Sequence, residues 1–220
     1  MRTIIYVGYA VSEEECMIAS GASVAGNKMQ LNVLKELTSY PDINVIPITV
    51  YPCAAYPRDS KLIYSEKKKE LWKNFTTIQI GFINLPIIKQ LCQMINVYIQ
   101  IEKQRKKYPD AEIFSFNMFP QVGNPLRWLK KKYKEKITIN TLLADPPVLV
   151  ENEEKKSTIL QKMFIEQAKK NIEAVDGAII LNKYAAYDFL KQGQKYIVVD
   201  GGINISEETG VGKIDYKERK

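Results

Sequence analysis

Histidine is absent from the sequence, and cysteine is scarce. Without histidine the chain cannot form a Ser-His-Asp or Cys-His catalytic site, an HExxH zinc site or a 2-His-1-carboxylate iron site. The three cysteines, Cys16, Cys53 and Cys92, are widely spaced and form no CxxC, which argues against a disulfide framework or a thiolate metal cluster. We therefore expect no metal site, and a reducing, cytoplasmic setting fits best.

Long apolar runs are also missing. No window reaches the roughly 18 uninterrupted apolar residues of a membrane span. Residues 1–15, MRTIIYVGYAVSEEE, reach acidic residues before a long apolar stretch develops, so they do not predict a signal peptide. The formal net charge of +7 is compatible with anionic partners, whether nucleotides, phospholipid surfaces or nucleic acid. Contact with a membrane, if any, is therefore expected at its surface.

What the chain does contain is enough apolar material for one large domain: 45% of its 220 residues are hydrophobic. Short runs rich in β-branched and aromatic residues predict strands that are apolar on both faces, as in a parallel sheet covered by helices on both sides. These runs are Thr3–Val7, Ile43–Val50, Thr77–Ile83, Glu112–Phe116, Ile137–Leu143, Ala178–Leu181 and Tyr196–Val199.

Segments with helical periodicity alternate with these strands. They are residues 26–37, residues 87–107, a helix opened by Asn124-Pro125, residues 157–174 with Ser157 as cap, and residues 183–191. The stripe of Ile88, Leu91, Ile95, Tyr98 and Ile99 is expected to pack against the sheet as ordinary core. The alternation predicts an α/β fold: a doubly wound, mostly parallel Rossmann-like sheet with helices on both faces. Residues 1–203 form the predicted domain and residues 204–220 a linker or tail.

The loop after the first strand is rich in small residues. In a doubly wound sheet, ligands bind outside the carboxyl ends of the strands. Here Gly21, Ala22, Ser23, Gly26 and Asn27 lead into the first predicted helix. The glycines would let the backbone approach a phosphate or sugar, and Ser23 can cap the helix or donate to a ligand. The alternative is a plain turn with close packing of helix on sheet.

Nucleotide-binding fingerprints do not fit this loop. It is not GxGxxG, and no acidic residue follows the second strand to hold a ribose, which disfavours a dinucleotide cofactor. Gly212-Lys213 lacks the upstream glycine of a Walker A loop.

Two further loops follow strands at the same predicted edge. Asn117 begins Asn-Met-Phe-Pro, and Asp145 lies in Ala-Asp-Pro-Pro. Asp145 can bind a hydroxyl, act as a base or make a turn before its prolines. Asn117 likewise has two interpretations: it contacts a sugar or acceptor hydroxyl, or it forms an Asx turn.

Taken in order, these motifs resemble the N-terminal half of GT-B-type, sugar-nucleotide-dependent retaining glycosyltransferases, which build cell-surface polysaccharides and glycolipids. The resemblance covers about residues 1–203. It is carried by Ser-Gly-Ala-Ser-x-Ala-Gly-Asn before a long helix, Phe-Asn-Met-Phe-Pro, Ala-Asp-Pro-Pro, and Val-Val-Asp-Gly-Gly-Ile at residues 198–203.

The resemblance implies a function and assigns roles to these residues. The loop of residues 21–27 would face the donor diphosphate and the acceptor across an interdomain cleft. Asn117 and Asp145 would lie on the acceptor side, with Asp145 as the candidate catalytic residue. The nucleotide sugar would be a substrate, so no cofactor is expected, and the acceptor would be a glycan or a lipid-linked sugar.

Family members bind the donor mainly through a second Rossmann domain. We therefore expect a donor-domain partner chain to be needed and these 220 residues alone to lack transferase activity.

Basic residues cluster at three places: Lys67–Lys69, Arg105–Lys107 and Lys130–Lys132. They are interpreted either as a rim held against an anionic membrane surface or as solvated helix ends. Nucleic acid is disfavoured because no recognised binding motif accompanies the charge. The sequence thus predicts a cytoplasmic protein that can lie at the inner face of the membrane. A non-catalytic glycan-binding module and another type of Rossmann-like nucleotide-binding protein remain alternatives.

Overall fold

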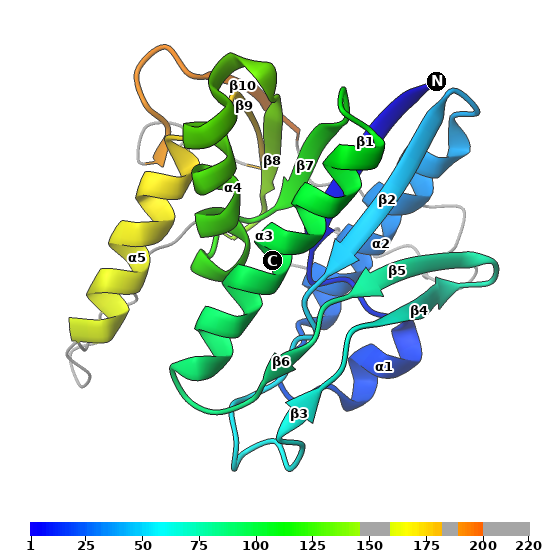
Figure 1. Cartoon of the computed structure of the whole chain (residues 1–220), viewed down its shortest axis with the longest axis vertical. Helices are drawn as coiled ribbons and strands as arrows, with labels where there is room; N and C mark the ends of the chain where they lie inside the picture. The colour runs from blue at the N-terminus through cyan, green and yellow to red at the C-terminus, as the bar shows by residue number, and fades with distance from the viewer. Residues whose placement is uncertain (146–158, 182–188, 200–220) are drawn as a thin grey trace, which may run out of the picture.

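The computed structural model describes residues 1–145, 159–181 and 189–199. An eight-stranded sheet forms the centre (Figure 1), in the order β10-β9-β8-β7-β1-β2-β5-β4. All neighbouring strands are parallel except β4, which pairs antiparallel to β5. The bounds are β1 (Arg2–Gly8), β2 (Ile43–Thr49), β4 (Lys67–Trp72), β5 (Phe75–Gln79), β7 (Glu112–Phe116), β8 (Ile139–Leu143), β9 (Gly177–Ile180) and β10 (Lys195–Val198).

Helices cover both faces of this sheet. Three lie on the near face in Figure 1: α3 (Ile88–Lys107), α4 (Pro120–Tyr133) and α5 (Ile159–Ile172). On the far face lie α1 (Glu13–Ile18) and α2 (Val24–Ser39). Two hydrophobic clusters separate the layers, one under α3, α4 and α5 and the other between α2 and the sheet. The predicted doubly wound, mostly parallel α/β fold is therefore confirmed.

The strand order reverses between β1 and β7. From β1 the chain proceeds to β2 and β5 on one side, whereas β7, β8, β9 and β10 continue on the other. Connections therefore leave the carboxyl ends of β1 and β7 in opposite directions and open a crevice between them. The loops beginning at Tyr9 and Asn117 emerge at this point.

Most of the predicted strands are present, with shifted ends. The run predicted at Thr77–Ile83 forms two strands, β5 and β6 (Phe82–Ile83), and β6 pairs with β3 (Ile63–Tyr64) in a separate ribbon. The helix predicted to open at Asn124 begins at Pro120, so Pro125 lies inside α4. Ser157, residues 183–188 of the predicted helix 183–191 and the predicted tail 204–220 lie outside the described residues.

Four short elements were missed, one of which is the 3-10 turn η1 (Lys134–Lys136) after α4. The six residues of α1 are too few to establish helical periodicity. The two residues of β3 carry no alternation, and β4 begins with three lysines. Lys67–Lys69 therefore lie on an edge strand and are not a helix end, as one interpretation had it; charged residues at such an edge discourage pairing with another chain. The other two basic clusters do end helices α3 and α4.

The predicted packing of α3 is wrong for four of the five residues of the stripe; the fifth, Tyr98, is half-buried and packs against the core. Ile88, Leu91, Ile95 and Ile99 are 43%, 51%, 51% and 51% exposed, so this stripe faces away from the sheet. The buried side of the helix combines the apolar Val97 and Ile101 with polar residues, namely Gln93, Gln100 and Arg105. Periodicity identified the stripe correctly but could not show which face meets the sheet, because the buried face is itself half polar.

Candidate functional site

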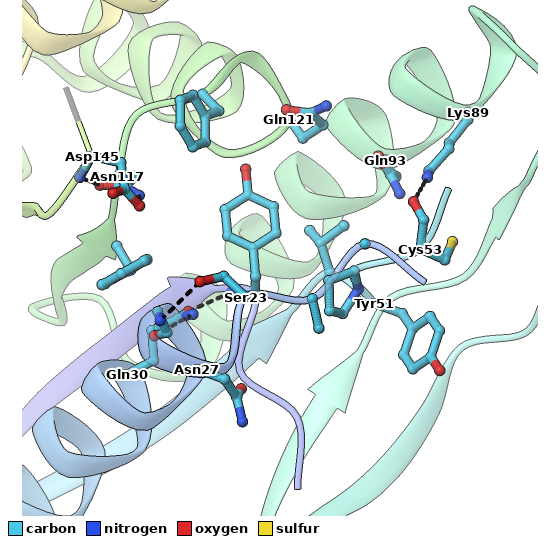
Figure 2. A pocket seen from close by; sticks show the side chains of 18 residues that line it. Ser23, Asn27, Gln30, Tyr51, Cys53, Lys89, Gln93, Asn117, Gln121 and Asp145 are labelled. Carbon is cyan, nitrogen blue, oxygen red and sulfur yellow. Dashed lines mark hydrogen bonds between the residues drawn. The ribbon is translucent and has the colours of Figure 1, made fainter. Parts of the chain in front are cut away.

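A cavity of about 260 Å³ opens at the strand switch point. Its walls come from the loops after β1, β2, β7 and β8 and from the first turns of α2, α3 and α4. All of the predicted site residues line it: Gly21, Ala22, Ser23, Gly26, Asn27, Asn117 and Asp145. Figure 2 shows Asn117 and Asp145 on one side and Cys53, Gln93 and Lys89 on the other. The structure thus brings together residues that are up to 124 positions apart in the chain, Gly21 and Asp145.

The N-terminus of α2 forms one wall of the cavity. Ser23 caps this helix, since its Oγ accepts from the Gly26 amide at 3.2 Å and its carbonyl accepts from the Asn27 amide at 2.8 Å. The amides of Val24 and Ala25, in the first turn, have no partner among the described residues. Free first-turn amides and the positive end of the helix dipole favour an anion at this wall.

Asn27 and Gln30 tie α2 to the loop after β1. The Asn27 Oδ1 accepts from the Val11 amide at 3.0 Å and its Nδ2 donates to the Val11 carbonyl at 3.1 Å. The Gln30 Oε1 accepts from the Tyr9 amide at 2.7 Å and from the Tyr6 hydroxyl at 3.0 Å. Asn27 therefore fixes the loop through both ends of its amide. Gln30, which sequence reasoning missed, holds the end of β1 through its Oε1 alone, since its Nε2 donates to the Gly26 carbonyl of its own helix.

Replacing Asn27 by leucine should destabilise the domain by about 2–4 kcal/mol. The change leaves the buried amide and carbonyl of Val11 without their partners, and each such group costs about 1–3 kcal/mol. The measurement is the free energy of unfolding in urea, with Lys28→Leu at the neighbouring exposed position as control. A loss below about 0.5 kcal/mol, the range of ordinary surface changes, would show that Asn27 does not hold the loop.

Asn117 joins the exits of β7 and β8. Its backbone lies in the left-handed region at φ 57°, which asparagine tolerates better than most residues. Its Oδ1 accepts from the amides of Ala144 and Asp145 at 2.9 and 3.1 Å, and its Nδ2 donates to Asp145 Oδ2 at 3.4 Å. Asp145 is exposed, so its carboxylate can still accept hydrogen bonds from a ligand hydroxyl.

Lys89 and Cys53 stand across the cavity from Asp145 (Figure 2). The Lys89 ammonium donates to the Cys53 carbonyl oxygen and retains further protons for a ligand. Burial raises the pKa of the Cys53 thiol, so the sulfur is protonated at neutral pH and is not a nucleophile. Sequence reasoning missed Lys89. Its signal was available, because a helix that follows a strand of a parallel sheet begins at the carboxyl edge.

Tyr9 was also missed, although it directly follows β1. The residue lines the cavity, and its buried hydroxyl has no hydrogen-bond partner among the described residues. Burial raises the pKa of this hydroxyl, so the proton stays on the oxygen. At the switch point Tyr9 therefore offers a donor that no described residue accepts from.

Comparisons with known proteins identify the fold. No family model and no curated protein matches the sequence. Sucrose-phosphate synthase from Thermosynechococcus elongatus is similar in structure over 94% of this chain and 49% of its own, with a TM-score of 0.59 and 10% sequence identity. A UDP-N-acetylglucosamine 2-epimerase aligns over 90% of this chain and 48% of its own, with a TM-score of 0.49 and 12% identity.

The chain spans about half the length of these two solved structures. At such low identity, the likeness to the synthase shows the fold alone, a Rossmann-like α/β domain. Among the helices within the described ranges, none is both long and apolar enough to cross a membrane.

Proposed function

We propose that this chain is the acceptor-side domain of a GT-B-type glycosyltransferase, in which a donor-binding domain completes the site. The reaction would transfer a sugar from a nucleotide-sugar donor to a cell-surface glycan or a lipid-linked acceptor. The observation that supports this proposal is the cavity at the strand switch point, where a lysine and a helix N-terminus face an exposed carboxylate. A likeness of fold to sucrose-phosphate synthase is consistent with it.

One side of the cavity suits the leaving diphosphate of the donor, and the other side suits the acceptor hydroxyl. Negative charge develops on the diphosphate as it leaves the sugar, and the first-turn amides of α2 and the Lys89 ammonium are groups that stabilise it. On the opposite side the Asp145 carboxylate would accept a hydrogen bond from the acceptor hydroxyl and take its proton as the new glycosidic bond forms. Asn117, which bonds the Asp145 amide, would position this carboxylate.

The test is binding and turnover of nucleotide sugars by the purified chain. Calorimetry with UDP-, ADP- and GDP-sugars and with pyrophosphate measures affinity, and transfer of labelled sugar is followed with and without a donor-type domain. We expect binding by the chain alone and transfer only when the second domain is added. Absence of both would overturn the proposal, and glycan binding without nucleotide binding would favour a non-catalytic glycan-binding module instead.

A lysine variant makes this test specific to the cavity. Lys89→Met removes the cation and is expected to weaken pyrophosphate binding by at least about tenfold, since a hydrogen bond to a charged group contributes about 1.5–3 kcal/mol. Lys28→Met makes the same change at an exposed position of α2 that does not line the cavity. Equal losses in the two variants would show that the anion does not bind beside Lys89.

Tyr9→Phe should separate ligand binding from stability. The free energy of unfolding should stay the same or rise, because the change removes a buried hydroxyl that has no partner among the described residues. Affinity for the ligand should fall about fivefold to tenfold, the value of one neutral hydrogen bond. Urea denaturation and calorimetry on the same preparation measure the two quantities. A clear loss of stability would mean that the hydroxyl is already satisfied within the fold.

A further inference from the structure

The outer face of α3 is apolar where a solvent-facing helix is ordinarily polar. Ile88, Leu91, Ile95 and Ile99 follow one another at spacings of three and four and project from the side opposite the buried Val97. At 1.5 Å per residue they span about 16 Å. Trp128 of α4, 39% exposed, extends this apolar face sideways through its edge contact with Tyr98 of α3.

The same face of α3 becomes cationic toward its C-terminus. Exposed Lys103, Lys106 and Lys107 continue the helix beyond Ile99. Lys103 and Lys107 also line a groove of about 340 Å³ together with Lys67 and Lys68 of the sheet edge. In the part of the chain that the structure describes, none of these five lysines forms an ion pair.

Acidic residues next to these lysines are already engaged. The Glu102 carboxylate accepts from Lys132 at 3.0 Å and from the Tyr133 hydroxyl at 2.7 Å. Glu66, which accepts from the neutral Gln100 side chain, lines the groove as the single carboxylate among its described residues, beside four lysines. An apolar stripe of three turns therefore continues directly into a cluster of cations whose charge is not balanced locally.

We propose that this α3 surface, defined as Ile88, Leu91, Ile95, Ile99, Lys103, Lys106 and Lys107, docks on an anionic lipid bilayer. The isoleucines and Leu91 would enter the boundary between headgroups and acyl chains, while the lysines contact anionic headgroups. Trp128 lies beside the stripe, where an indole ring suits the membrane interface. This inference uses none of the cavity residues and does not depend on the proposed function.

A second copy of the chain fits this surface less well. Parallel pairing of two α3 helices would place lysines against lysines. Antiparallel pairing would place the lysines of one copy over the isoleucines of the other, with no acidic residue to receive them. A surface of lipid headgroups supplies negative charge and an apolar layer together, which matches both halves of the α3 surface.

Docking would also orient the cavity. Lys89 and Gln93, in the first two turns of the same helix, line the cavity wall. The apolar stripe begins at Ile88, next to Lys89 in sequence. The cavity mouth would therefore lie within reach of the interface, where a lipid-borne ligand is held.

Vesicle flotation of the full chain tests this docking. The probes are phosphatidylcholine vesicles with and without phosphatidylglycerol, at low and high salt. We expect binding to the anionic vesicles that weakens with salt. The double variant Ile95→Asp/Ile99→Asp should reduce the partition coefficient at least about tenfold, because it removes apolar burial and adds charge of the same sign as the surface. Met163→Asp, at a 61% exposed position of α5, is the apolar control and should bind as the parent chain does.

A second variant set tests the cationic half. Lys103→Gln/Lys106→Gln/Lys107→Gln should lower the partition coefficient on the order of a hundredfold, whereas Lys28→Gln/Lys35→Gln/Lys73→Gln, at exposed sites outside this surface, should change it far less. Failure of the parent chain to bind anionic vesicles would overturn the proposal. So would equal binding by the α3 variants and their controls. Sedimentation velocity showing a dimer that Ile95→Asp/Ile99→Asp dissociates, without vesicle binding, would assign the surface to a second copy instead.

Discussion

Replacing Gly123 by valine is expected to destabilise the domain by about 3–5 kcal/mol, the largest loss of stability predicted here. A Cβ at this position of α4 would lie 2.5 Å from Asn171 Nδ2 and 2.5 Å from the Met118 carbonyl oxygen. Those two atoms form a buried hydrogen bond of 3.3 Å between α5 and the loop before α4. The new side chain would therefore have to break this bond and also push the two helices apart.

Urea denaturation of the Gly123→Val chain measures this loss, and a domain of ordinary stability would be left close to unfolding. Gly193→Ala is the contrasting control. Gly193 has a φ of 81° and no atom within 4 Å of an added Cβ, so its substitution tests backbone strain without crowding. It should cost about 1 kcal/mol. A Gly123→Val chain as stable as the parent would show that α4 and α5 do not approach this closely.

The second large effect concerns the cavity and depends on the proposed function. Gly21→Val is expected to reduce sugar transfer, measured with a donor domain supplied, on the order of a hundredfold. A Cβ at Gly21 would lie 3.0 to 3.2 Å from three backbone atoms of Cys53, so the loop has to move away from the strand β2 exit. Gly21 is exposed, and the free energy of unfolding should change little.

Gly26→Ala, a smaller change at a residue that also lines the cavity, is the comparison within this loop. An added Cβ there meets only the Ser23 side chain, at 3.3 to 3.4 Å, and a side chain can rotate where backbone cannot. Gly26→Ala should therefore retain transfer within about tenfold of the parent. Equal activity of the Gly21→Val and parent chains would show that the loop is a plain turn, the alternative left open by its sequence.

The doubly wound, mostly parallel sheet and the edge at which the predicted site residues lie could be predicted because they follow from local patterns and general topology. Buried parallel strands such as β1 and β7 are nearly continuous apolar runs, and a doubly wound sheet binds ligands at its carboxyl edge. The grouping of Gly21, Asn117 and Asp145 around one cavity follows from these two rules alone.

What the sequence could not reveal depends on tertiary packing. Whether the apolar stripe of α3 faces the sheet or the solvent depends on how the buried Gln93 and Gln100 are accommodated against the sheet. The periodicity of the sequence carries no information about this packing. Val11 bonds both ends of the Asn27 side-chain amide, and this pairing depends on the path of an irregular loop. That the Tyr9 hydroxyl has no partner among the described residues depends on the positions of all the side chains around it. Side-chain pairing of this kind is visible only in three dimensions.

The two edge strands of the sheet differ in their ability to pair with a strand of another molecule. At one edge β4 presents Lys67, Lys68 and Lys69, and charge at this position repels an incoming strand. At the other edge β10 presents Tyr196, Ile197 and Val198, each 43% to 57% exposed. Polymerisation by strand pairing needs two receptive edges on each molecule, and among the described residues the sheet offers one, β10. Contact between β10 edges would therefore stop at a pair, so this asymmetry protects the chain against fibre growth.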